Sequence, residues 1–143
     1  MNLYKEAVVA LLSGQTTKKN KKEIWWEDAD GNKLTVEGIN KECYIVRRNG
    51  NTCYYKNGQL HRTDGPAVIY ASGDQRWYQN GQYHRIDGPA VVFADGAQYW
   101  YQNGQRHRTD GPAVIYADGE QRWCLKGIHY TKEEWLIKRN EYH

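Results

Sequence analysis

The chain has 143 residues, enough for one domain with a core, although only 39% of them are hydrophobic. Its formal net charge of +3 is compatible with an anionic partner without requiring one. The three cysteines, Cys43, Cys53 and Cys124, form no CxxC pair and cannot all be bridged, which favours a reducing compartment. The apolar run from Ala7 to Leu12 is too short to span a membrane and lacks a signal cleavage site. We therefore expect a soluble, cytoplasmic protein without a membrane partner.

The first 43 residues carry two predicted segments. Residues 1–22 are predicted to form a helix over 3–12 and then a Lys-rich linker, because apolar residues recur at helical spacing before the basic run at 18–22. That run also fits a nucleic-acid or localisation patch, but the acidic residues that follow at once favour a solvated linker. Residues 23–43 are expected to form a capping hairpin, with strands from 24 to 36 around the turn Asp30-Gly31.

A repeat occupies residues 44–130. Gly-Pro-Ala recurs at 65–67, 88–90 and 111–113, an interval of 23 residues. Trp77, Trp100 and Trp123 recur at the same interval, and Tyr54 takes the Trp position in an earlier, degenerate unit. Such a period indicates an array of equivalent supersecondary units, none of which can bury its apolar surface alone.

Each unit is predicted to be a meander of tight hairpins. Asn-Gly and Asp-Gly pairs favour two-residue turns because both central residues need a positive φ. One such turn is expected at Asn80-Gly81 and its equivalents, and the other at Asn49-Gly50, Ser72-Gly73, Asp95-Gly96 and Asp118-Gly119. With both turns two residues long, Val68 lies opposite Trp77, Trp77 opposite His84, and His84 opposite Val91.

This register divides the side chains of each unit between two faces of the sheet. The first face carries Val, Tyr or Phe, Gln, Trp and His in every unit and is predicted to be packed scaffold. On the second face, the residue changes from unit to unit at two equivalent positions, which we call the variable columns. The first column holds Cys53, Arg76, Tyr99 and Arg122, and the second holds Leu60, Tyr83, Arg106 and His129. Because scaffold packing requires constant residues and partner contacts do not, we expect the second face to bind the partner. Its candidate contact residues are Arg76, Tyr78, Tyr83, Arg85, Tyr99, Tyr101, Arg106, Arg108 and Arg122.

The recurring histidines and Arg-x-Asp pairs are interpreted as structural. His61, His84 and His107 belong to units that advance roughly 10 to 14 Å each, too far for one zinc ion to join them. Each is expected to pack beside a Trp and to donate to a backbone carbonyl. The Arg-x-Asp pair occurs three times, as in Arg85 and Asp87, with Asp accepting bonds in its own turn and Arg pairing locally. A catalytic site is asymmetric, so no enzymatic activity, cofactor or metal is expected.

Residues 131–143 are predicted to close the array. Thr131 and Glu134 have the spacing of a capping box, which predicts a helix over 132–141. A helix at this edge would keep the array from pairing with copies of itself.

The string Trp-Tyr-Gln-Asn-Gly-Gln-X-His-Arg-X-Asp-Gly-Pro-Ala-Val, at 77–91 and 100–114, resembles a repeat in hypothetical proteins of bacteriophages, bacteria and giant viruses. It is similar to the wider group of MORN-type β-hairpin repeats, and the resemblance covers residues 44–130 and the Tyr130-Thr131-Lys132-Glu133-Glu134-Trp135 ending. It implies a mainly β fold, an elongated or curled antiparallel β-hairpin repeat sheet with short terminal helices. It also implies a role in binding proteins or, for some MORN proteins, lipid headgroups, although the glycine pattern of this chain departs from the MORN pattern.

The leading functional hypothesis is a non-catalytic module that binds a host protein, as a phage-encoded inhibitor of a bacterial defence protein would. Two alternatives stay open. Arginine interleaved with tyrosine also suits single-stranded nucleic acid or a nucleotide, and the array could be purely structural. The same composition is typical of protein-binding hot spots, and the acidic residues near the arginines weigh against nucleic acid. The sequence does not predict an oligomeric state.

Overall fold

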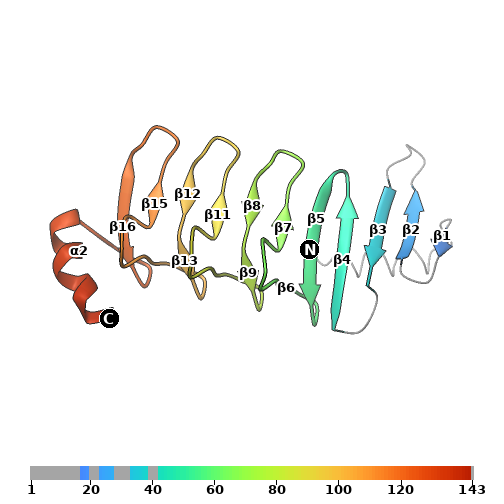
Figure 1. Cartoon of the computed structure of the whole chain (residues 1–143), viewed down its shortest axis with the longest axis horizontal. Helices are drawn as coiled ribbons and strands as arrows, with labels where there is room; N and C mark the ends of the chain where they lie inside the picture. Colours follow the sequence, from blue (N-terminus) through green and yellow to red (C-terminus); the bar gives the residue numbers. More distant parts are fainter. Residues whose placement is uncertain (1–16, 20–22, 28–32, 39–41, 143) are drawn as a thin grey trace.

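The structure is a computed structural model that describes residues 17–19, 23–27, 33–38 and 42–142. Antiparallel strands lie side by side along one long axis, and a C-terminal helix stands at the end of the row (Figure 1). The described strands form an open, mainly antiparallel β-sheet with short hairpins attached, which confirms the predicted fold class. The helix predicted over 3–12 lies outside the described residues.

The long sheet has 13 strands in the order β1-β2-β3-β4-β5-β7-β8-β11-β12-β15-β16-β17, with β6 paired to β5. The strands before the repeat are β1 (Thr17–Lys19), β2 (Glu23–Glu27) and β3 (Lys33–Glu37). The degenerate first unit holds β4 (Cys43–Arg48), β5 (Asn51–Lys56) and β6 (Gln59–Leu60). The next units hold β7 (Val68–Ile69), β8 (Gln75–Arg76), β9 (Tyr78–Gln79) and β10 (Gln82–Tyr83), then β11 (Val91–Val92), β12 (Gln98–Tyr99), β13 (Tyr101–Gln102) and β14 (Gln105–Arg106). The last unit holds β15 (Val114–Ile115), β16 (Gln121–Leu125) and β17 (Ile128–Tyr130).

The strands before the repeat and those of its degenerate first unit belong to the same sheet. β2 and β3 form the hairpin predicted around Asp30-Gly31, whose tip lies outside the described residues. β1 pairs with β2, so three residues of the predicted linker form a strand. β4 and β5 are joined by the expected two-residue turn, in which Asn49 and Gly50 have φ of 51° and 79°. The hydrophobic core beside this turn consists of Leu34, Val36, Tyr44, Val46 and Tyr55.

The first hairpin loop of each later unit has three residues and not the predicted two. Val68 pairs with Arg76, and the loop between these strands contains one residue with positive φ, Gly73 at 97°. The Ser72 hydroxyl accepts from the Asp74 N–H at 3.4 Å. Asp95 and Asp118 make the equivalent bonds in the next two units. A side chain that bonds its own loop in this way favours a type I turn, which a left-handed glycine then completes as a three-residue hairpin loop.

The extra loop residue moves every strand partner by one position and rearranges the two predicted faces. The predicted opposition of Val68 to Trp77, and of His84 to Val91, is wrong. Each valine lies opposite the first variable column instead, and the pairs are Val68 with Cys53 and Arg76, Val91 with Arg76 and Tyr99, and Val114 with Tyr99 and Arg122. The valine column therefore shares a face with the first variable column.

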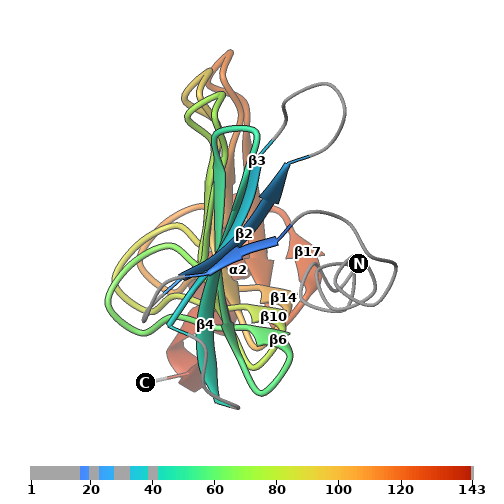
Figure 2. The same ribbon diagram turned by 90° about the vertical axis from the view of Figure 1, so that its right-hand side faces the viewer.

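The second hairpin of each unit follows the prediction. Asn80 and Gly81 have φ of 51° and 77°, β9 pairs with β10, and the His84 N–H donates to the Trp77 carbonyl at 3.1 Å. Each small hairpin also bonds to the preceding unit, because the Gly81 N–H donates to the Leu60 carbonyl. Figure 2 shows β6, β10 and β14 on one side of the long sheet and the three Gly-Pro-Ala loops on the other.

The histidines join consecutive units. The Nδ1 atoms of His61, His84 and His107 accept from backbone N–H groups nineteen residues further on, those of Asn80, Asn103 and Lys126, at 3.0, 3.0 and 2.9 Å. This bond differs from the predicted one, in which the ring donates to a backbone carbonyl, because here Nδ1 is the acceptor. A ring nitrogen that accepts a hydrogen bond is unprotonated. Burial, and after it the positive charge of Lys126, lowers the pKa of His107 below its ordinary value of 6.5.

The C-terminal helix begins as predicted and ends earlier. Thr131 and Glu134 form the capping box of α2 (Lys132–Lys138), which is followed by the 3-10 helix η1 (Arg139–Tyr142). Trp135 of α2 is buried and packs against Trp123, with 4.6 Å between ring centroids. Its Nε1–H donates to the Arg108 carbonyl at 3.0 Å. The helix thus covers the last tryptophan of the repeat.

Removing one complete period should leave a folded protein. Deleting residues 67–89 joins Pro66 to Ala90, which is equivalent to Ala67, so each remaining unit keeps a neighbour of the right kind. Deleting only residues 67–78 breaks the register and should prevent folding. Circular dichroism and urea unfolding compare the two variants. Equal loss of structure in both would mean that the protein is a single cooperative globule and not a linear array.

Mild acid should destabilise the array through His107. Because its folded pKa lies below 6.5, its contribution to the free energy of unfolding is complete above that pH and is lost as the pH falls through the folded value. The stability difference between the wild type and His107→Gln should therefore shrink between about pH 7.5 and pH 5. Urea unfolding of both proteins across this range measures the difference. A constant difference would contradict a role for the neutral ring.

Candidate functional site

The repeated Arg-x-Asp-Gly-Pro motif is a structural unit built on an arginine stacked over an aromatic ring. The Arg85 guanidinium lies 4.1 Å from the centre of the Trp77 ring, its Nε donates to Asp87 at 3.0 Å, and its Nη1 donates to the Pro89 carbonyl at 3.1 Å. The hydrogen bond and the charge of Arg85 lower the pKa of the Asp87 carboxyl. The same contacts recur for Arg62 over Tyr54 and for Arg108 over Trp100.

Glycine follows in this motif because the guanidinium passes directly over its backbone. A Cβ placed on Gly88 would lie 2.7 Å from the Arg85 Cζ, closer than any real contact allows. Arg85 and Arg108 are among the residues predicted to contact the partner. The structure places each guanidinium between an aromatic ring and the glycine of its own Arg-x-Asp-Gly-Pro motif.

The two variable columns do meet, as one connected network of arginine and tyrosine. Arg76 Nη1 donates to the Tyr83 hydroxyl at 3.0 Å, and the Tyr83 ring lies 4.4 Å from Tyr78 and 5.0 Å from Tyr101. Arg106 Nε donates to the Tyr101 hydroxyl at 3.3 Å. Burial, and after it the neighbouring Tyr83 hydroxyl, raises the pKa of Tyr78. We call these five residues the Arg–Tyr network.

A row of aromatic residues that the sequence prediction assigned to the other face lies beside this network. Arg76 lies 5.2 Å from the ring centres of both Tyr70 and Phe93. Tyr99 meets Phe93 and Tyr116 edge to face, at 5.4 and 6.0 Å between centroids. The prediction missed Tyr70, Phe93 and Tyr116 because it assumed a two-residue loop. The signal for the longer loop is the Ser or Asp at its second position. Its side chain can accept a hydrogen bond within the loop, which favours three loop residues and so puts these aromatic residues on this face.

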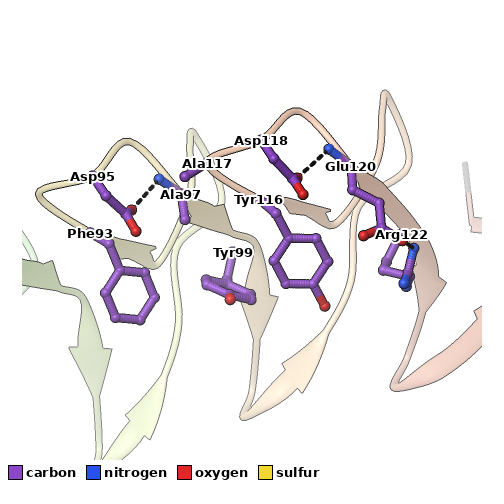
Figure 3. Close-up of a pocket in the computed structure, with 9 residues that line it drawn as sticks. All are labelled: Phe93, Asp95, Ala97, Tyr99, Tyr116, Ala117, Asp118, Glu120 and Arg122. Atoms are coloured by element: carbon purple, nitrogen blue, oxygen red, sulfur yellow. Dashed lines mark hydrogen bonds and ion pairs between the residues drawn. The ribbon is translucent and has the colours of Figure 1, made fainter.

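A groove of about 730 Å³ opens on this face between two hairpin loops. Phe93 and Tyr116 stand on either side of it and Tyr99 lies between them (Figure 3). Acidic residues also line the groove, namely Asp95, Asp118 and Glu120, and Glu120 is paired with Arg122. Burial, and after it the neighbouring Tyr116, raises the pKa of Tyr99. A groove with aromatic walls and polar groups at its edge is suited to binding a side chain of a partner.

Comparisons of the chain with protein-family models, curated proteins and solved structures find no match. Among the described residues, no group of three or more His, Cys, Asp or Glu side chains is placed to hold a metal ion. No helix in the described ranges combines the length and the apolar character needed to cross a membrane.

Adding one methyl group at Gly88 should displace the stacked arginine. The φ of Gly88 is not in the left-handed region, so Gly88→Ala tests the clash with Arg85 and not the backbone. We expect it to lower the free energy of unfolding by about 1–3 kcal/mol. In an Arg85→Ala background the clash is absent and the same change should cost much less. Urea unfolding of the wild type, Gly88→Ala, Arg85→Ala and the double variant completes this double-mutant cycle. An equal cost of Gly88→Ala in both backgrounds would contradict the stacking explanation.

Proposed function

We propose that the chain is a non-catalytic repeat module that binds a protein partner through the face carrying the groove and the Arg–Tyr network. The observation that carries this proposal is the convergence of both variable columns on that face. Arginine and tyrosine dominate the hot spots of protein interfaces. The residues shared by all units hold the array together, whereas the residues that change from unit to unit gather where a partner can reach them.

The arrangement of this face also favours tight binding. Arg76 is held by the Tyr83 hydroxyl and by the rings of Tyr70 and Phe93. Arg106 is held by the Tyr101 hydroxyl. Side chains already ordered in the free protein lose less conformational entropy when a partner binds. The face therefore needs fewer favourable contacts to reach a given affinity.

The resemblance of the repeat to sequences in bacteriophages and bacteria supports a more specific setting. We propose a phage-encoded inhibitor that acts in the bacterial cytoplasm by occupying a host defence protein. The analogy between the repeats supports this setting.

Charge on this face argues for protein over single-stranded nucleic acid. Arg76, Arg106 and Arg122 supply positive charge, but the groove beside them is lined by Asp95, Asp118 and Glu120. Phosphates would meet these carboxylates along the same surface. A nucleic-acid ligand is therefore the competing outcome of the binding test.

Photo-crosslinking and side-chain truncation together should distinguish a protein partner from a single-stranded nucleic acid. A photo-crosslinking residue at Arg106, which is exposed, should capture a specific host protein, whereas one at Gln98, on the opposite face, should not. Against that purified partner, one or two of Arg76→Ala, Tyr99→Ala, Arg106→Ala and Arg122→Ala should cost about 2 kcal/mol or more by calorimetry, and the others should be nearly silent.

Micromolar or tighter binding to generic single-stranded DNA or RNA at near-physiological salt would favour nucleic acid. In that case affinity should fall steeply with salt, and each Arg→Ala change should reduce the slope by up to about one unit. The Gln98→Ala variant is the matched control in both assays.

A further inference from the structure

Polar side chains tie each hairpin loop to the next one along the array, with one exception. Asn51 Oδ1 accepts from the Ala71 N–H at 2.9 Å, and Asp74 Oδ1 accepts from the Ala94 N–H at 2.8 Å. The next residue in this column is Ala97, which has no acceptor. No hydrogen bond to the Ala117 N–H is formed by any residue in the ranges that the structure describes. The sequence of loop-to-loop bonds therefore stops at Ala97.

The loops also separate at this point. A Cβ placed on Gly50 would lie 3.0 Å from the Ala71 Cβ, and one placed on Gly73 would lie 3.7 Å from the Ala94 Cβ. One placed on Gly96 would meet no atom within 4 Å. The groove lies at this break, with Ala97 and Ala117 next to each other in its lining (Figure 3). The groove thus includes the position that an acceptor side chain occupies in the preceding units.

The lining selects among the side chains that could fill this space. A side chain that fills this space as Asn51 and Asp74 do in the preceding units accepts from the next loop's N–H, which a lysine or arginine side chain cannot do. Asp95 and Asp118 each use one carboxylate oxygen to accept a backbone N–H and keep a second oxygen. With Glu120 nearby, these carboxylates repel an anionic side chain. A neutral carboxamide has both the acceptor for Ala117 and the donors for Asp95 or Asp118.

We propose that the groove binds an asparagine side chain presented by the protein partner. Its carbonyl oxygen accepts from the Ala117 N–H, as Asn51 accepts from Ala71 within the array, and its amide group donates to Asp95 or Asp118. Phe93 and Tyr116 flank the planar amide. The proposal rests on the protein-binding role proposed above and specifies what that partner must present.

A peptide titration followed by NMR tests the chemistry on the intact chain. The probe is acetyl-Gly-Asn-Gly-N-methylamide, compared with peptides that carry Asp or Arg at the central position. We expect a saturable shift of the Ala117 amide resonance with the Asn peptide in the roughly millimolar range, and at least about fivefold weaker binding of the other two. Equal affinity for all three peptides, or no shift at Ala117, would overturn the proposal.

Filling the groove from within provides the matching variants. Ala97→Asn should restore the loop-to-loop bond, slow hydrogen exchange of the Ala117 amide and abolish the peptide shift. Ala97→Val should block the peptide without protecting that amide, and Gln98→Ala should change neither. Normal peptide binding by Ala97→Asn would count against the proposal, and the wild-type titration decides the matter should a variant fail to fold.

The same variants separate this inference from the protein-binding role. If Ala97→Asn captures the crosslinked partner as well as the wild type does, while Tyr99→Ala does not, the partner binds this face without an asparagine in the groove. The protein-binding role then stands and the asparagine proposal falls. If Ala97→Asn fails to capture the partner while Gln98→Ala still captures it, the result supports both the protein-binding role and the asparagine proposal.

Discussion

The architecture of this protein depends on the number of residues in one recurring hairpin loop. Side chains alternate between the two faces of a strand, so one additional residue in the loop exchanges the faces of everything that follows. The three-residue loop at Ala71, Ser72 and Gly73 places Arg76 opposite Val68. Repeated along the array, this register brings valine, arginine and aromatic residues to one face. The groove and the Arg–Tyr network both follow from it.

The two sides of the sheet have different tasks. On one side, Arg85 is enclosed by Trp77 and the Gly88 backbone, and this arrangement recurs in each complete unit. On the other side, the positions corresponding to Arg76 change from unit to unit. Linear arrays gain stability from contacts between neighbouring units, so the residues that make those contacts must stay constant. The residues outside them are available for binding.

Asymmetry in a repetitive protein arises where one unit departs from the others. Asn51 and Asp74 each reach the next loop, whereas Ala97 does not. The missing acceptor coincides with the groove between these loops, which Phe93, Tyr99 and Tyr116 line. A repeat array can therefore acquire a specific site without changing its backbone plan, because removing one internal bond exposes a donor and a shaped space together.

Local chemistry in the sequence determined the period, the antiparallel strands, the Asn-Gly turns, the pairing of Arg85 with Asp87 and the capping box at Thr131. Each of these depends on residues close together in the chain, through positive φ, short side-chain bonds or hydrophobic pattern. Only the tertiary structure decided which residues share a face, because Asp-Gly is compatible with loops of two or three residues. It also decided that His84 accepts from Asn103 and that, within the described part of the chain, no residue accepts from the Ala117 N–H. Those contacts join residues about one repeat apart, and they exist only when one unit stacks on the next.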